Sequence, residues 1–109
     1  MNDRCAFILH AHTRPEKSAK FEALFSRYVA ASRAEAGCIE YHMLRDAADP
    51  TLFIFFEVWQ SAAHLEAHNA LPHMQHFREQ QMMYLTRDVE IRPVNMLSAP
   101  SSEPARPLR

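Results

Sequence analysis

The chain has 109 residues, of which 48% are hydrophobic; this fits one globular domain with a modest core and excludes a disordered chain. The formal net charge is -1 with both signs interspersed, so no basic stripe is present to bind nucleic acid, and no apolar run is long enough to span a membrane. We expect no signal peptide, and with only two cysteines, Cys5 and Cys38, the composition favours a soluble cytoplasmic protein over a secreted disulfide scaffold.

The N-terminal third of the chain predicts a strand followed by a helix. Residues 5–12 favour the strand. The helix is expected to begin at Pro15, because proline is favoured in a first helical turn, and Thr13 and Glu16 have the spacing of a capping box. It is expected to end at Gly37, since glycine tolerates the positive φ that closes a helix. With this single glycine the chain cannot build a glycine-rich phosphate or dinucleotide loop.

The rest of the chain predicts three more strands and a second helical segment that is broken in two. The strands are expected over 38–46, 51–59 and 87–97, and the helices over 62–70 and 73–85. Ser61 is suited to cap the first of these helices, and Pro72 interrupts the segment. The strand over 51–59 is apolar on both faces, so we expect it at the centre of a sheet and covered on both sides.

The resulting order, β-α-β-β-α-β, is the ferredoxin-like arrangement of the α+β class. We expect a four-stranded antiparallel sheet with the first and third strands in the middle and the helices on one face. The other face must still carry apolar residues of the third strand, so we expect it to pack against a second copy of the chain in a homodimer. The domain is expected to span residues 1–97, with 98–109 as a tail rich in proline, serine and arginine.

Seven histidines raise the question of metal chemistry. His64 and His68 have the i, i+4 spacing of two metal ligands on one helix, and a later histidine could add a third. No H-E-x-x-H pattern is present and no cysteine joins the group, so we predict no metal site and no bound cofactor. His10 and His12 share one face of the first strand, where they border either the pocket or the dimer sheet.

One stretch carries an ordered motif, E-x-W-x-S-x-x-x-L-x-x-H, formed by Glu57, Trp59, Ser61, Leu65 and His68. It resembles the antibiotic biosynthesis monooxygenase (ABM) family of dimeric α/β barrels. Further segments that match this family follow in the same order: G-C-x-x-Y from Gly37 to Tyr41, D-P-x-x-F from Asp49 to Phe53, and Pro72-His73 with Phe77. The resemblance covers roughly residues 5–97.

The resemblance implies a dimeric barrel with a pocket for a small hydrophobic aromatic substrate. The implied activity is quinol-monooxygenase-like: cofactor-free oxidation of a quinol or an anthrone-like phenol by molecular oxygen. His68 would accept or orient the phenolic proton. Trp59, Tyr41 and Phe77 would form the pocket walls, and His73 would lie at the mouth.

Other functions of similar proteins give alternatives. Haem degraders typically carry an asparagine on the first strand, which this chain lacks, so haem degradation is not expected. An isomerase of a small phosphorylated sugar would need an anion site, for which Arg45 and Arg78 are the candidates. A non-catalytic barrel that binds a small ligand would use the same pocket. In that case Trp59 is simply a core aromatic and His68 a hydrogen-bonded core histidine.

Overall fold

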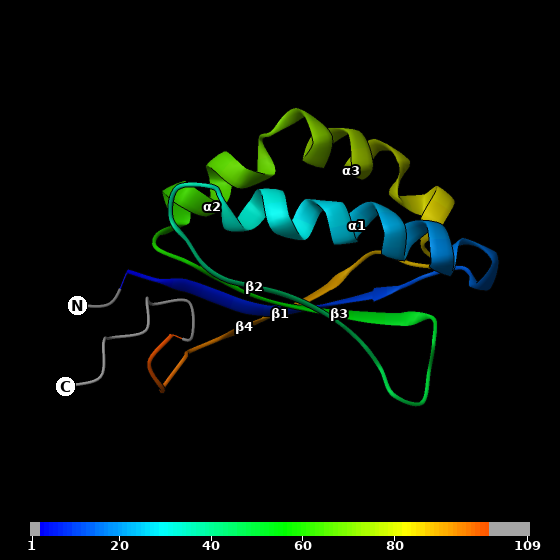
Figure 1. Ribbon diagram of the computed structural model, residues 1–109, viewed down its shortest axis with the longest axis horizontal. Helices are drawn as coiled ribbons and strands as arrows, with labels where there is room; N and C mark the ends of the chain where they lie inside the picture. The colour runs from blue at the N-terminus through cyan, green and yellow to red at the C-terminus, as the bar shows by residue number, and fades with distance from the viewer. Residues whose placement is uncertain (1–2, 101–109) are drawn as a thin grey trace.

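The computed structural model of the chain describes residues 3–100, and within this range the elements follow the predicted order. The strands are β1 (Cys5–His12), β2 (Cys38–Arg45), β3 (Leu52–Trp59) and β4 (Glu90–Val94). The helices are the short 3-10 helix η1 (Pro15–Lys17), α1 (Ser18–Arg33), α2 (Ala62–Asn69) and α3 (Pro72–Tyr84). The α-helices all lie on one face of the sheet (Figure 1). The fold is therefore α+β and ferredoxin-like, as predicted.

The four strands form one antiparallel sheet in the order β2-β3-β1-β4, which puts the first and third strands in the middle. Alternate side chains of β3 point to the helices, and Phe53, Phe55 and Trp59 are 1%, 2% and 0% exposed there. On the opposite face, which we call the open face, Ile54 and Phe56 are only half-buried. The central place of the third strand is confirmed. Its expected cover on both sides is not complete within residues 3–100, because the helices lie on one face only.

The core between the sheet and the helices is built largely from phenylalanine rings. Phe21 and Phe25, one helical turn apart on α1, stack with their centroids 4.6 Å apart. Phe25 meets Phe77 of α3 edge-on at 4.8 Å, and Phe21 lies 4.9 Å from Phe53 of β3. Such aromatic pairs each add about 0.5–1.5 kcal/mol beyond the burial of their area, so they help to fix α1 and α3 on the sheet.

The first helical turn begins at Pro15, as predicted, but the expected capping box does not form. Thr13 does not form a capping box with Glu16. Its hydroxyl lies 2.6 Å from the Ser18 hydroxyl and donates to the backbone carbonyl of Thr51 at 3.0 Å. The physical reason is that Thr13 still belongs to the sheet, where it forms a bridge with Leu85. The helical path therefore begins beyond Thr13, as the tight turn η1 that leads into α1.

The end of α1 and the length of β4 also differ from the prediction. α1 ends at Arg33 rather than at Gly37, and the residues between them form turns that lead into β2. Gly37 has the expected positive φ, 83°, but in this connection rather than at the helix end. β4 covers Glu90–Val94 instead of 87–97, because the chain bends at Thr86 and Arg87 and pairs with β1 only from Glu90 to Val94.

Both cysteines are free, as expected. Cys5 of β1 and Cys38 of β2 pair with Trp59 from opposite sides, so β3 lies between them. Two backbones separated by an intervening strand are too far apart for a disulfide. Burial raises the pKa of the Cys38 thiol to about 11, which keeps the sulfur protonated and unreactive.

Two further predictions concern membrane-spanning segments and the C-terminal tail. Within residues 3–100, no helix has the length and apolar character needed to cross a membrane. Most of the predicted tail over 98–109 lies outside the described residues.

Candidate functional site

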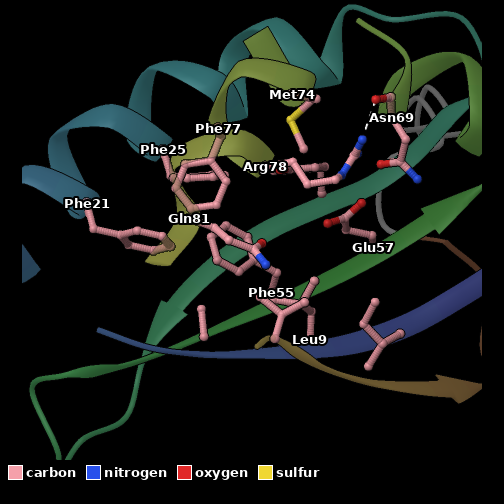
Figure 2. A pocket seen from close by; sticks show the side chains of 14 residues that line it. Leu9, Phe21, Phe25, Phe55, Glu57, Asn69, Met74, Phe77, Arg78 and Gln81 are labelled. Carbon is pink, nitrogen blue, oxygen red and sulfur yellow. Dashed lines mark hydrogen bonds between the residues drawn. The ribbon is translucent and has the colours of Figure 1, made fainter. Parts of the chain in front are cut away.

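A pocket of about 210 Å³ lies between the helix side of the sheet and helices α1 and α3 (Figure 2). Its apolar walls come from both layers: Leu9 and Phe55 from the sheet, Phe21 and Phe25 from α1, and Met74 and Phe77 from α3. The polar residues that line it are Tyr41, Glu57, Asn69, Arg78 and Gln81. A mainly apolar cavity with a few converging polar groups is typical of a small-molecule site.

The pocket has a polar end and an aromatic end. Figure 2 shows Glu57, Asn69 and Arg78 at one end, with Phe21 and Phe25 at the other. Arg78 Nη2 donates a hydrogen bond of 3.2 Å to the backbone oxygen of Asn69, which ties α3 to the last residue of α2. A flat phenol would fit this arrangement with its ring against the aromatic side chains and its oxygen toward the polar end.

Glu57 is the buried acid of the pocket and is only 5% exposed. Its Oε1 accepts a hydrogen bond of 2.9 Å from the indole Nε1 of Trp59. Burial raises the pKa of the Glu57 carboxyl to about 7, against the opposing effect of the Trp59 hydrogen bond and with a smaller contribution from the charge of Glu35. A carboxyl with such a pKa is populated in both protonation states at neutral pH, which is what a general base or acid requires.

Tyr41 lies directly opposite Glu57 in the pairing of β2 with β3. It is 2% exposed, and its backbone oxygen accepts a hydrogen bond of 2.9 Å from Arg33 Nε. Burial, together with the charge of Glu57, raises the pKa of the Tyr41 phenol far above its ordinary value. Tyr41 therefore stays protonated and can donate a hydrogen bond, but it cannot act as a base.

His68 of α2 lies in the layer behind the pocket wall and is 2% exposed. Its ring centroid is 4.6 Å from that of Trp59 and 5.8 Å from that of Tyr41. Its Nδ1 lies 2.9 Å and 3.1 Å from the two carboxylate oxygens of Glu35, so Nδ1 carries a proton and donates it. Burial lowers the pKa of His68, although the Glu35 carboxylate opposes this, and the ring is therefore neutral at neutral pH.

Of the five predicted site residues, two line the pocket and three, Trp59, His68 and His73, are outside its lining. Tyr41 and Phe77 line the pocket. Trp59 and His68 are outside its lining, where they contact each other and support the wall. His73, the second residue of α3, packs its ring on Tyr28 of α1 at 4.5 Å. The Nε2 atom of His73 is buried without a hydrogen-bond partner among the described residues.

Sequence reasoning missed the role of the pocket acid, although a signal for it is present. Glu57 alternates with Phe55 and Trp59 along β3, and this period of two places its carboxyl on the buried face. An acidic residue at a buried position of an apolar strand is rare and points to a function. For Asn69 and Gln81 the sequence offers no comparable signal, because both follow from how α2 and α3 meet the sheet.

The histidine pair with metal-ligand spacing is held by other partners. His64 Nδ1 lies 2.8 Å from the hydroxyl of Ser61, which also caps α2 as predicted by accepting from the His64 backbone N–H. His68 is hydrogen-bonded to Glu35. The two rings therefore face separate hydrogen-bond partners, Ser61 just before α2 and Glu35 in the connection between α1 and β2.

Known proteins of similar sequence place this chain in one group. A protein-family model described as antibiotic biosynthesis monooxygenase matches residues 7–80. A protein of Mycobacterium tuberculosis, Rv0793, which is provisionally named a monooxygenase, is 32% identical over 91 residues that cover 84% of this chain and 89% of the relative. An uncharacterized protein of Synechocystis is 35% identical over 79 residues, 72% of this chain, but the match spans only 54% of that relative's length.

Solved structures show the same fold. The crystal structure of PA3566 from Pseudomonas aeruginosa superposes with a TM-score of 0.81 at 31% sequence identity, covering 90% of this chain and 98% of that one. The structure of Rv0793 superposes with a TM-score of 0.78 at 28% identity, covering 88% and 97% of the two chains. The likeness therefore extends over nearly the whole domain rather than over an isolated motif.

Proposed function

Because the chain belongs to the antibiotic biosynthesis monooxygenase family, we propose that it is a cofactor-independent monooxygenase that oxidises a small quinol with molecular oxygen. The observation that carries this proposal is a buried carboxyl, Glu57, with a pKa of about 7 in a mainly apolar pocket. Such a group can remove a proton from a quinol and hold it in a place with little water.

The size of the pocket supports a substrate of one or two rings over a three-ring anthrone. A cavity of about 150 Å³ is known to hold one benzene molecule. The pocket here measures about 210 Å³, and its aromatic end is lined by Phe21, Phe25 and Phe77. We therefore infer a benzoquinol or a naphthoquinol, bound with one hydroxyl toward Glu57.

The proposed reaction balances without a cofactor. Glu57 accepts the proton of one quinol hydroxyl, and the resulting anion transfers one electron to O₂. The substrate radical and superoxide then combine at a ring carbon to form a peroxide, which takes up a proton and loses water. One oxygen atom of O₂ remains in the hydroxyquinone product and the other leaves as water, so the quinol supplies all four electrons.

The other site residues have supporting roles in this proposal. Tyr41 donates a hydrogen bond to the substrate oxygen, and Phe77 forms part of the ring-binding wall. Trp59 holds the Glu57 carboxylate through its indole N–H, which is 2.9 Å away. His68 acts as an orienting group, because it packs on Trp59 from behind while Glu35 holds its ring. We place His73 near the pocket mouth, at the start of α3.

We also propose a homodimer that forms through the open face of the sheet, in the cytoplasm. Ile8 and Ile54 are half-buried there, and Leu44 is 50% exposed, in neighbouring strands. An apolar face of this kind is usually covered by another protein surface, and a second copy of the same sheet is the simplest cover.

An isomerase of a phosphorylated sugar is less well supported. The Glu57 carboxylate at the polar end would repel a phosphate group. Of the two cations considered for this role, Arg45 is paired with Glu22 on the surface, and Arg78 lies exposed at the edge of the pocket.

Oxygen uptake tests the proposed activity directly. The protein is supplied with a panel of benzoquinols and naphthoquinols, and the spontaneous oxidation in protein-free buffer is subtracted. With isotopically labelled O₂ we expect one labelled oxygen atom per molecule of product and no requirement for added flavin, haem or metal. If quinols bind and are protected from oxidation, the chain is a ligand-binding barrel and the proposal is wrong.

A further inference from the structure

A second cluster of side chains lies on the other side of the sheet from the pocket. His10 and His12 of β1 and Glu90 of β4 all project from the open face, whereas their strand neighbours Leu9 and Ile91 line the pocket. His10 pairs directly with Glu90 in the β1–β4 register, and His12 follows two residues later on the same face. The register of the two strands therefore brings the three side chains together.

We propose that His10, His12 and Glu90 form a binding site for a divalent transition-metal ion such as Zn²⁺. His10 Nδ1 lies 3.9 Å and His12 Nε2 lies 3.6 Å from the same carboxylate oxygen of Glu90. One ligand atom from each of the three residues lies within 4.8 Å of the others. Two imidazole nitrogens and one carboxylate oxygen are a donor set that Zn²⁺ and its neighbours in the first transition row prefer.

The distances suit a metal after a small adjustment. Bonds of about 2.0–2.2 Å in tetrahedral geometry place neighbouring ligand atoms about 3.3–3.6 Å apart. The His12–Glu90 distance of 3.6 Å already fits this range, and the His10–Glu90 distance of 3.9 Å is slightly longer. In the single chain the side chains of His10, His12 and Glu90 are 41%, 18% and 55% exposed, so they can rotate to take up an ion. Because they project from the open face, an ion bound there would lie beside the second copy in the proposed homodimer. Three protein ligands leave the fourth position for water.

Arg87 competes with the metal for this cluster. Its Nη2 donates to His12 Nδ1 at 3.2 Å, and its Nη1 lies 3.8 Å from Glu90 Oε2. Because a guanidinium can only donate, the neutral His12 ring carries its proton on Nε2, the atom that faces Glu90. Binding of a metal to Nε2 requires that proton to leave and Nδ1 to release Arg87. The Arg87 side chain is 58% exposed, so it is free to turn toward solvent.

The test is calorimetric titration of untagged, metal-free protein with Zn²⁺, supported by the visible absorption of Co²⁺ as a substitute ion. We expect one site per chain. His12→Ala and Glu90→Gln should each weaken it at least about tenfold, as loss of a coordinating group does. His76→Ala, which removes an exposed histidine on α3, is the matched control and should leave the affinity unchanged. Arg87→Ala should bind Zn²⁺ several-fold more tightly.

The metal site can be tested independently of the proposed quinol oxidation. The cluster and the pocket lie on opposite faces of the sheet, so His12→Ala should keep the wild-type rate of quinol oxidation. Circular dichroism verifies that each variant is folded. The proposed metal site is contradicted if the wild type binds no Zn²⁺ at about 1 mM, a concentration high enough to reveal even weak binding. It is equally wrong if His76→Ala weakens binding as much as His12→Ala, or if Arg87→Ala weakens it.

Discussion

The indole Nε1 of Trp59 donates a hydrogen bond of 2.9 Å to the carboxylate of Glu57, two positions earlier on the same strand. Both side chains lie on the helix side of β3 and are almost fully buried. Burial favours the neutral carboxyl, whereas the hydrogen bond favours the ionised one, and together they hold the pKa of Glu57 at about 7. The E-x-W spacing in the sequence thus has a chemical consequence, because the tryptophan tunes the acid.

Replacement of Trp59 by phenylalanine should therefore change the pH dependence of activity. Without the indole N–H, the pKa of Glu57 rises above about 7. A hydrogen bond to a charged group is worth about 1.5–3 kcal/mol, so the midpoint of kcat/KM against pH should move up by about one to two pH units. Tyr41→Phe is the control, since the Tyr41 phenol is neutral at these pH values, and its midpoint should stay in place. An unchanged midpoint in Trp59→Phe contradicts the role assigned to the hydrogen bond.

The raised pKa of Glu57 also predicts how stability depends on pH. A solvated glutamate has a pKa of 4.5, so between that pH and about 7 the folded protein binds more protons than the unfolded chain does. Ionisation of Glu57 therefore lowers the free energy of unfolding as pH rises through this window, by about 3 kcal/mol in all. Glu57→Gln keeps an acceptor for the Trp59 indole N–H and has no carboxyl to ionise, so it does not lose this stability as the pH rises.

Urea unfolding of the wild type and of Glu57→Gln at pH 4.5 and pH 8 measures the effect. The variant should gain about 3 kcal/mol relative to the wild type between the two pH values. A difference between the two proteins that is the same at both pH values would falsify the raised pKa.

The contact between Glu35 and His68 should matter for stability. His68 is 2% exposed, and its Nδ1–H has the Glu35 carboxylate as acceptor. Glu35→Ala leaves a buried donor unsatisfied, which should cost about 1–3 kcal/mol in the free energy of unfolding. The control is Glu22→Ala, which breaks the exposed ion pair with Arg45 and should cost less than about 1 kcal/mol. Equal losses in the two variants would show that His68 does not depend on Glu35.

Gly37 should not tolerate a side chain. Its φ of 83° disfavours any L-residue with a Cβ, and an added Cβ would lie 2.3 Å from the ring of His64. We expect Gly37→Ala to lower the free energy of unfolding by about 2 kcal/mol or more. Ala36→Ser changes the exposed neighbour and should be nearly neutral. Thermal unfolding followed by circular dichroism compares them, and a wild-type midpoint in Gly37→Ala would show that the turn has another conformation.

The open face of the sheet predicts the oligomeric state. Size-exclusion chromatography with light scattering should give a dimer for the wild type at low micromolar concentration. Ile54→Asp places a charge at the centre of the apolar open face and should yield a folded monomer. Met83→Asp, at a side chain that is 59% exposed on α3, is the control and should remain dimeric. A monomeric wild type would contradict the proposed dimer.

The order of elements and the central third strand were predictable because both depend on local patterns. The apolar run over 51–59 could only fit the middle of the sheet, and Ser61 and Pro72 marked the helix starts that the structure has. The end of α1 was not predictable in the same way. Gly37 signals a positive φ, but whether this φ closes the helix or serves a later turn depends on the tertiary path into β2.

The candidate site was predictable only in part, because the burial of a side chain depends on the tertiary structure. Tyr41 and Phe77 were expected at the pocket and line it. Histidine was the expected proton acceptor because its ordinary pKa lies near neutrality, whereas that of a glutamate does not. The pKa of Glu57 reaches this range only through burial, which depends on how α1 and α3 cover the sheet. A property of that kind cannot be obtained from the residue type alone.

The most direct test of Glu57 as the proton acceptor compares the rate of quinol oxidation by Glu57→Gln with that of the wild type. The comparison covers pH 5 to 9, which is about two pH units on either side of the Glu57 pKa of about 7. The wild-type kcat/KM should rise with pH and level off above about 7, after the spontaneous oxidation is subtracted. Glu57→Gln should lose about a hundredfold to ten-thousandfold of kcat/KM while it remains folded and binds the quinol. A folded Glu57→Gln protein with the wild-type rate and pH profile would contradict the assignment of Glu57 as the proton acceptor.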